Sequence, residues 1–400
     1  MQPGRRTVLG GITTGAAALI GGGSVLAHRG GRPGVSESDA RDAARATAER
    51  IAGRAEGPEW QSPTLDEGVT FFASEKGCDD GSSSSYSRTA QVFTVRDGGA
   101  PAGYVTAAAR RDWTPILEYS AATSPARLLD AARSDARGQG FEPTGRLLYH
   151  GGVKYGLELA GGRAMNLRDG RVTDVRGYDP ASMSFDPETV ERRWTDLGDA
   201  TGSTGGATEA SSGQWSDTLY DVPAWEENDE GKKDSTSYGP KGDAWSEWDG
   251  CSPVAGSMII AYHEGKDEQD TWYQEYYIDK LHESMDTNYD GVTKYWNIDD
   301  GFDDFDGGSH SYNGRNIYSW HHPDFVKSEI SDNERPFQLN MRNGGCANDR
   351  NNDYGEHSVV VVGYTDDGET FKIHDGWDDE IHYLSWGAWS ECMYTMVTVS

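Results

Sequence analysis

The chain of 400 residues is long enough for two domains of ordinary size, and its 66 acidic against 36 basic residues give a formal charge of −30. Such a charge repels nucleic-acid phosphates and anionic lipid headgroups, so it argues against a protein that binds either through a broad basic face. The acidic residues are spread over both halves among 13 Trp and 20 Tyr, whereas disordered acidic tails are poor in aromatic residues. The composition therefore predicts a folded protein with an acidic, halophilic type of surface that suits concentrated salt.

The first residues have the features of an export signal. Arg5 and Arg6 precede an uncharged stretch, rich in Gly and Ala, that ends at Ala27. This pattern resembles a twin-arginine (Tat) signal, so we expect residues 1–35 to direct the protein to the cell surface or the extracellular space. The stretch is too short and too weakly apolar for stable membrane insertion, and no later segment reaches the length of a membrane span.

Residues 36–195 predict a small α+β domain that shows no catalytic motif. Ala alternates with charged residues at helical spacing over 38–56, and a second helix is expected near 125–137. Short runs of β-branched or aromatic residues between Gly and Pro turns predict an antiparallel meander. These runs are 91–95, 103–107, 115–119, 146–149, 154–159 and a hairpin over 166–173 that turns at Asp169-Gly170.

Residues 196–240 predict a linker. The stretch 197–213 loses all periodicity and consists mainly of Gly, Ser, Thr and Ala, and the chain stays acidic and rich in turns up to about residue 240. We therefore expect a separate second domain over residues 241–400.

The sequence after Cys251 predicts a helix that starts at this cysteine. Pro253 suits the first helical turn, and apolar residues then recur at helical intervals. The amide hydrogens and the positive dipole end of a helix N-terminus favour thiolate over thiol, as a nucleophilic cysteine requires. An inert cysteine that caps a core helix has the same local pattern, so the interpretation depends on a partner for Cys251.

A histidine and an aspartate supply that partner. His357 lies just before the run Val359–Val362, which is typical of a central strand buried on both faces. Asp375 follows the next strand, and Asp366-Asp367-Gly368 predicts a tight hairpin between the two strands. We therefore expect His357 and Asp375 to be neighbours. A thiolate that faces an imidazole held by a carboxylate is what acyl transfer requires.

Three motifs together resemble those of papain-like cysteine peptidases of the bacteriocin-leader-processing (peptidase C39-like) type and their streptopain-type relatives. They are GCSPVAGSM at 250–258, GEHSVVVVGY at 355–364 and DGW at 375–377. The resemblance covers about residues 240–400. It implies an α+β fold in which a papain-like catalytic domain packs its N-terminal nucleophile helix on an antiparallel sheet.

The resemblance also implies an activity and its residues. It implies a thiol protease that hydrolyses peptide bonds of a peptide or protein substrate, with no cofactor and no metal. Carried over residue by residue, Cys251 is the nucleophile, His357 the general base and acid, and Asp375 the residue that orients His357. His374 is a rival for the third role, but alternation along a strand places His374 and Asp375 on opposite faces.

The sequence departs from this family at one position. Related peptidases carry a Gln about six residues before the cysteine as an oxyanion donor, and here Trp245 stands there. The nearest side-chain donor is Ser246, which would share the oxyanion with the Cys251 amide. Loss of one such donor costs roughly 3 kcal/mol of transition-state stabilisation.

Three segments of the first domain resemble, more weakly, the pro-region of streptopain-type enzymes. They are 103–106, 115–120 and 147–152. The resemblance implies that residues 36–195 form a pro-region-like domain that acts as an intramolecular inhibitor or folding chaperone of the catalytic domain.

The sequence also contains a segment similar to a calcium loop and a candidate pair of cysteines for a disulfide. The segment 286–291 opens like a calcium loop, but Asn297 stands where a bidentate Glu closes such a site, which favours an ordinary solvated loop. Among four cysteines, Cys346 and Cys392 are the best candidates for one disulfide in an oxidising compartment.

The sequence leaves alternatives to a secreted cysteine peptidase. Because the Gln is missing, the chain is also compatible with a catalytically inactive papain-fold module that binds a partner or sits on the cell surface. The same residues could also transfer an acyl group to an amine instead of water.

Overall fold

The computed structural model describes much of one compact unit, which spans residues 32–400. The described stretches are 34–54, 57–74, 86–174, 185–202, 216–226, 249–317, 323–342, 356–365, 368–389 and 391–400. The expected export signal lies almost wholly outside these stretches, and Cys78, Trp245, Ser246 and Cys346 lie outside them as well. In the described part of the chain, no helix combines the length and apolarity that a membrane crossing requires.

The stretch 34–202, called here the N-terminal half, contains three α-helices and nine strands among its described residues. The helices are α1 (Glu37–Ile51), α2 (Leu129–Gly138) and α3 (Pro187–Gly202). The strands are β1 (Thr64–Leu65), β2 (Val69–Ser74), β3 (Tyr86–Asp97), β4 (Ala100–Ala108), β5 (Ile116–Ser120), β6 (Pro143–Tyr149), β7 (Tyr155–Leu159), β8 (Arg163–Asn166) and β9 (Val172–Asp174).

The stretch 216–400, called here the C-terminal half, has the remaining elements. Its helices are α4 (Cys251–His263), α5 (Thr271–Ser284), α6 (Tyr295–Asp303) and α7 (Pro323–Lys327), the last continued by a π-helical turn at Ser328–Asp332. Its strands are β10 (Asp217–Thr218), β11 (Tyr312–Ile317), β12 (Phe337–Arg342), β13 (Glu356–Thr365), β14 (Thr370–His374), β15 (His382–Ser385) and β16 (Glu391–Val399).

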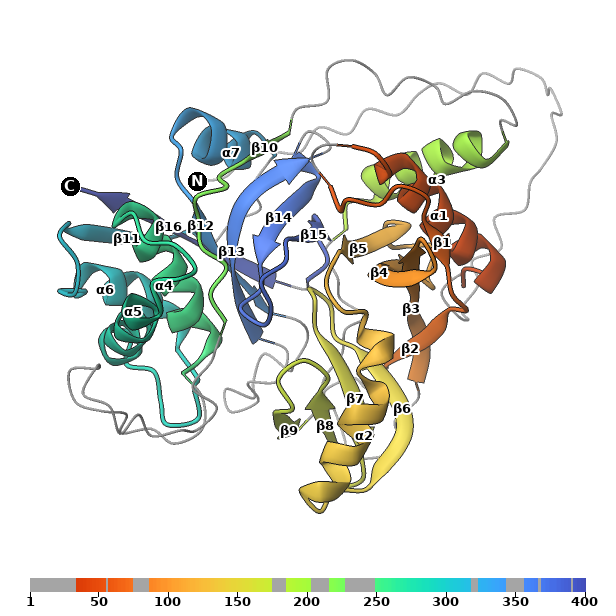
Figure 1. Ribbon diagram of the computed structural model, residues 1–400, viewed down its shortest axis with the longest axis horizontal. Helices are drawn as coiled ribbons and strands as arrows, with labels where there is room; N and C mark the ends of the chain where they lie inside the picture. The colour runs from red at the N-terminus through yellow and green to blue at the C-terminus, as the bar shows by residue number, and fades with distance from the viewer. Residues whose placement is uncertain are drawn as a thin grey trace, which may run out of the picture. The chain divides into compact units, whose positions relative to one another are not determined.

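The described strands join into one sheet that crosses both halves (Figure 1). The order is β11-β16-β12-β13-β14-β15-β5-β4-β3-β2-β6-β7-β8-β9, with β1 beside β3 and β10 beside β13. Neighbouring strands are antiparallel except β2 and β6. The mainly antiparallel sheet with separate helical segments is compatible with the predicted α+β class.

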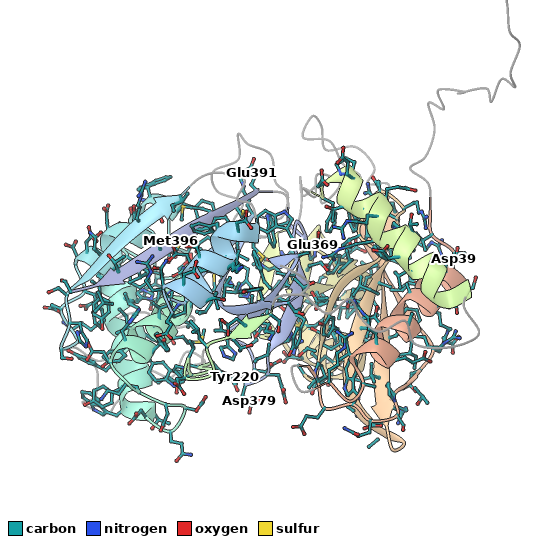
Figure 2. All side chains as sticks on the ribbon, turned by 90° about the horizontal axis from the view of Figure 1, so that it is seen from above. Asp39, Tyr220, Glu369, Asp379, Glu391 and Met396 are labelled. Atoms are coloured by element: carbon teal, nitrogen blue, oxygen red, sulfur yellow. The ribbon has the colours of Figure 1, made fainter. Side chains whose placement is uncertain are left out.

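The two halves meet where β5 pairs with β15. Tyr119 lies opposite Tyr383, and their rings stack with centroids 4.5 Å apart. A second contact joins α3 to the start of β14, where Glu369 (Figure 2) accepts hydrogen bonds from Arg193 and pairs with Arg192. Within the expected linker 196–240, β10 pairs with β13 and so belongs to the sheet of the C-terminal half.

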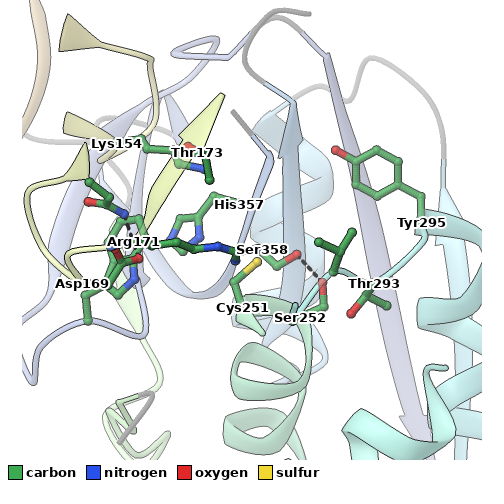
Figure 3. Close-up of a pocket in the computed structure, with 14 residues that line it drawn as sticks. Lys154, Asp169, Arg171, Thr173, Cys251, Ser252, Thr293, Tyr295, His357 and Ser358 are labelled. Atoms are coloured by element: carbon green, nitrogen blue, oxygen red, sulfur yellow. Dashed lines mark hydrogen bonds between the residues drawn. The ribbon is translucent and has the colours of Figure 1, made fainter. Parts of the chain in front are cut away.

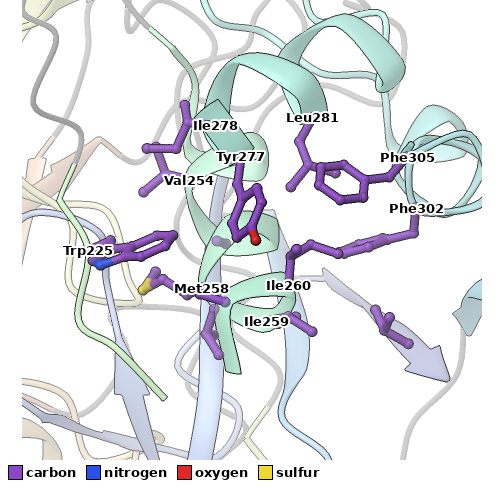
Figure 4. Close-up of a cluster of buried hydrophobic side chains, with 14 of the residues drawn as sticks. Trp225, Val254, Met258, Ile259, Ile260, Tyr277, Ile278, Leu281, Phe302 and Phe305 are labelled. Carbon is purple, nitrogen blue, oxygen red and sulfur yellow. The ribbon is translucent and has the colours of Figure 1, made fainter. Parts of the chain in front are cut away.

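The helices of the C-terminal half pack on one face of β13. α4 is buried from Ser252 through Ala261, so it is a core helix, and its buried residues are not confined to the apolar stripe that the sequence predicted. Val360 and Val362 of β13 share a core cluster with residues of α4, α5 and α6, part of which is drawn in Figure 4. The alternate valines, Val359 and Val361, lie in a second cluster on the opposite face. β13 is therefore buried on both faces, as the four-valine run predicts.

We expect Leu281→Ala to lower the free energy of unfolding by about 2–5 kcal/mol, because it leaves a cavity in a packed core. Leu281 is fully buried in the cluster between α4 and α5. The exposed Tyr220, which keeps 69% of its surface, provides the control, and Tyr220→Ser should change stability by no more than about 0.5 kcal/mol. Denaturant titration of both variants measures the difference; equal losses would show that the cluster is not a tight core.

Candidate active site

Cys251 is the first residue of α4, as predicted, and the turn before it is held from two sides. Gly250 has φ 97°, and a Cβ at this position would lie 2.5 Å from the carbonyl oxygen of Gly291. On the other side, Nδ1 of His282 on α5 lies 2.7 Å from the carbonyl oxygen of Asp249. Only glycine fits this turn, so the helix start is fixed against the 288–292 loop. The sequence analysis singled out neither His282 nor Gly291.

The first turn of α4 is tied to β13 by buried polar residues. The hydroxyl oxygens of Ser252 and Ser358 lie 2.8 Å apart, and Ser358 donates a hydrogen bond to Oδ1 of Asn340 at 2.6 Å. Because Ser358 follows His357 directly, these bonds bring the helix that carries Cys251 to the strand that carries His357 (Figure 3).

The imidazole of His357 is buried and held in one orientation. It stacks on the indole of Trp377, with ring centroids 3.9 Å apart and planes 3° from parallel. β13 and β14 pair so that Val360 lies opposite His374. Continued for three more residues, the same register places His357 opposite Trp377. His357 also has a hydrogen bond to the main chain of Asp375. This bond raises the pKa of His357, so its acceptor is the carbonyl oxygen of Asp375.

The orientation of His357 suits a general base. Nε2 has no hydrogen-bond partner among the described residues, so Nδ1 makes the bond to the Asp375 carbonyl. Nδ1 therefore carries the proton and Nε2 an open lone pair. Burial and the cation of Lys154 hold the pKa of His357 well below its ordinary value, so the ring is neutral in this structure.

Asp375 is next to His357, but its carboxylate points elsewhere. Oδ1 accepts the backbone N–H of Trp377 at 2.9 Å, and Oδ2 lies 3.2 Å from Nε2 of His382. The group that meets His357 is thus the peptide carbonyl of Asp375, whereas the sequence predicted its carboxylate. His374 is also buried, and its Nδ1 has no hydrogen-bond partner among the described residues.

Cys251 and His357 border one cavity of about 70 Å³, which has room for a few water molecules. The C-terminal half contributes Cys251, Ser252, Gly291, Val292, Thr293, Tyr295, His357, Ser358 and Trp377 to its wall. The N-terminal half contributes Lys154, Asn166, Asp169, Arg171 and Thr173. Residues far apart in the sequence therefore enclose the thiol, as Figure 3 shows.

The β8–β9 loop is anchored in the wall of this cavity. Asp169 accepts hydrogen bonds from the amide of Asn166 at 2.9 Å and from the backbone N–H of Arg171 at 2.8 Å. Nη2 of Arg171 donates to the carbonyl oxygen of Asp290 at 2.6 Å. Gly170 has φ 73°, which confirms the turn predicted at Asp169-Gly170, although the loop between the strands is longer than a two-residue turn.

In the described part of the chain, one group of side chains offers donor atoms close enough for a metal ion. Atoms of Asp375, Asp378 and His382 lie within 4.8 Å of one another, and the sequence analysis singled out neither Asp378 nor His382. Arg168 forms an ion pair with Asp378 and so already places a positive charge there.

In the segment 286–291, which opens like a calcium loop, Oδ1 of Asn288 accepts the backbone N–H groups of Asp290 and Val292.

The C-terminal half has a match among known families. Residues 224–392 match the model of the Peptidase_C39 like family. This region resembles that family. A comparison with curated proteins gives no match. The C39-like region includes Cys251, His357 and Asp375, whereas Lys154 and the β8–β9 loop lie outside it. The predicted resemblance of residues 36–195 to a pro-region stays a prediction.

We expect Gly250→Ala to lower stability by about 1–3 kcal/mol and to slow alkylation of Cys251, because the new Cβ displaces the turn from Gly291. Gly265 is the matched control, since it also has a positive φ of 62° but open space around its Cβ. Gly265→Ala should cost stability through the backbone alone and leave the alkylation rate unchanged. Denaturation and mass spectrometry of iodoacetamide-treated protein test both; equal rates in the two variants would contradict the role given to this turn.

We expect Lys154→Gln to raise the pKa of His357, because it removes a cation that disfavours the protonated ring. Lys266, whose ammonium lies 3.8 Å from the ring centroid of Tyr273, provides the control. NMR titration of ¹⁵N-histidine in the full chain follows the ring directly. A His357 titration that is the same in Lys154→Gln, Lys266→Gln and the wild type would show that Lys154 does not act on His357.

Proposed function

We propose that the chain is a papain-like cysteine peptidase that hydrolyses peptide bonds through a thioester on Cys251. The observation that carries this proposal is that Cys251, at the start of α4, and His357, whose Nε2 has no hydrogen-bond partner among the described residues, line the same cavity. The match of residues 224–392 to a C39-like peptidase family supports it. No residue of this site needs a cofactor for the reaction.

The reaction uses Cys251 and His357 in two steps. Nε2 of His357 takes the thiol proton, the sulfur attacks the peptide carbonyl carbon, and the resulting imidazolium gives the proton to the leaving amine. His357 then takes a proton from water, which attacks the thioester and releases the acid and the free thiol. The carbonyl of Asp375 keeps the proton on Nδ1, and Trp377 keeps the ring plane fixed. The first-turn amides of α4, that of Cys251 among them, offer donors for the oxyanion.

We propose that the N-terminal half is an intramolecular inhibitor in the state seen here. The cavity beside Cys251 has too little room for a peptide, and five residues between 154 and 173 make up much of its wall. Lys154 also holds His357 neutral, so it opposes the imidazolium that the reaction needs. A substrate therefore requires that the β8–β9 loop move away. The extensive contact with the C-terminal half is compatible with a chaperone role as well.

We also propose that the protein works outside the cell or on its surface, on peptide or protein substrates. The paired Arg5 and Arg6 support export by a twin-arginine route, which carries folded proteins. The formal charge of −30 supports solubility in high salt and disfavours nucleic acids and anionic membranes as partners.

A second candidate function is an inactive module of the same fold that binds a partner. The observation that favours it is Trp245, which stands where related peptidases carry the oxyanion-binding Gln. An intact but unreactive Cys251 would distinguish this module from an enzyme.

We expect the purified full chain, in high salt, to cleave casein or its own linker, and Cys251→Ala to abolish cleavage. Iodoacetamide at mildly acidic pH should label Cys251 much faster than Cys392, because burial raises the pKa of the Cys392 thiol to about 11. Intact mass before and after alkylation reports signal removal, loss of the N-terminal half and thiol reactivity together. Cleavage that persists in Cys251→Ala, or equal labelling of the two thiols, would overturn the proposal.

A further inference from the structure

A buried charged network lies behind Asp375, at the contact between the two halves. His382, the first residue of β15, is fully buried, and its Nε2 lies 3.0 Å from Oδ1 of Asp378 and 3.2 Å from Oδ2 of Asp375. Nδ1 of the same ring lies 3.1 Å from the hydroxyl of Tyr104 on β4. None of the three neighbours of His382, which are Asp375, Asp378 and Tyr104, forms or breaks a bond in the proposed reaction.

The hydrogen bonds around Tyr104 fix where the protons are. The hydroxyl of Tyr104 donates its single proton to Glu118 at 2.7 Å and accepts from Arg168 at 3.3 Å. It therefore offers His382 only a lone pair, so Nδ1 of His382 must be the donor. Oε2 of Glu118 accepts the backbone N–H of Val153 at 2.9 Å, and the ionised carboxylate accepts from Tyr104 through Oε1. Burial raises the pKa of Glu118, whereas the hydrogen bond from Tyr104 and the charge of His382 lower it.

The other ring nitrogen also needs a proton. Nε2 of His382 faces oxygen atoms of two carboxylates, and Arg168 pairs with the outer oxygen of Asp378. If the proton sat on Asp375 instead, the lone pair of Nε2 would point at the carboxylate of Asp378. Both nitrogens of His382 are thus donors, which makes the ring an imidazolium.

The electrostatic surroundings agree with this assignment. The two carboxylates raise the pKa of His382 against the effect of its burial, and the same histidine and Arg168 help to hold the pKa of Asp378 at about 2. Groups that act on this cluster come from several elements: Glu118 (β5), Arg168 (β8–β9 loop), His357 (β13), His374 (β14) and Glu380 (the loop before β15).

The cluster is connected to the candidate active site through one residue. Oδ2 of Asp375 lies at ion-pair distance from His382 without a hydrogen bond, Oδ1 accepts the N–H of Trp377, and the main-chain carbonyl faces His357. A displacement of the Asp375 side chain therefore moves the carbonyl and the indole that together hold the His357 ring.

We propose that His382 is a positioning residue: as a buried imidazolium it holds Asp375 and Asp378, and through Asp375 it fixes the tautomer and orientation of His357. The role rests on the proposed function, because it matters only if His357 is the base. Tyr104 and Arg168 belong to the N-terminal half, so this half completes the support of the catalytic histidine as well as covering the cavity.

The same three side chains could instead hold a metal ion, with Nε2 as a lone-pair ligand. The positive charge of Arg168 beside Asp378 favours the imidazolium, because that guanidinium already offsets one carboxylate.

The first test does not depend on peptidase activity. In the full chain with ¹⁵N-labelled histidine, we expect NMR at neutral pH to show His382 protonated on both nitrogens and His357 protonated on Nδ1 alone. In His382→Gln, the single-tautomer signal of His357 should be lost or shifted. A lone pair on Nε2 of His382, or histidine signals that change on dialysis against EDTA, would overturn the proposal, the latter in favour of a metal.

The second test uses the pH profile of hydrolysis by the full chain. His382→Gln keeps an N–H donor but removes the charge, and we expect it to lower kcat by about 10²-fold with KM within about twofold, because misorientation of a catalytic group acts on the transition state. Tyr104→Phe removes the hydroxyl that accepts from His382 and Arg168 and donates to Glu118, so it should lower kcat as well, by roughly fivefold or more. His263→Gln is the matched control.

The control residue His263 is remote from the candidate active site. His263 lies at the far end of α4, twelve residues or roughly 18 Å of helix from Cys251, and its replacement should leave the profile unchanged. A folded His382→Gln protein with a wild-type profile, or one that loses only substrate affinity, would overturn the positioning role. If the wild type hydrolyses nothing, the proposed function fails, while the NMR test still decides whether His382 orders His357.

Discussion

The burial of β13 on both faces is the constraint on which the rest of the molecule depends. α4 can cover one face only with its apolar residues, and that contact sets the start of the helix beside the start of the strand. Ser252 and Ser358 close the same contact with a buried hydrogen bond. Because Cys251 and His357 are the neighbours of these serines in the sequence, the packing of α4 on β13 also brings the candidate nucleophile and base to one cavity.

The environment of His357 favours the neutral ring. A buried imidazole next to a cation stays neutral, since low dielectric and like charge both disfavour the protonated ring. Lys154 comes from the N-terminal half, whereas His357 comes from the C-terminal half. The cavity that remains beside the thiol has a volume of about 70 Å³, and the N-terminal half limits it.

The contact between the halves combines two kinds of interaction with different consequences. Pairing of β5 with β15 extends the sheet and covers an edge strand. This backbone pairing stabilises the contact between the halves without depending on charged side chains. The cluster of His382, Asp375, Asp378 and Arg168 buries charges that are costly unless all of them are paired. Such a cluster stabilises one arrangement of the site strongly, because loss of any member leaves an unpaired charge in the interior.

The sequence by itself determined the features that depend on local patterns: the start of a helix at Cys251, a doubly buried strand after His357, a turn at Gly170 and the meander of the N-terminal half. Helix caps and alternation are short-range, so they can be read from neighbours in the chain. Only the tertiary structure decided that the carbonyl of Asp375, and not its carboxylate, holds His357, because that choice depends on strand register and on His382 opposite it. The entry of Lys154 into the cavity wall likewise depends on packing between residues about two hundred positions apart, for which a single sequence has no signal.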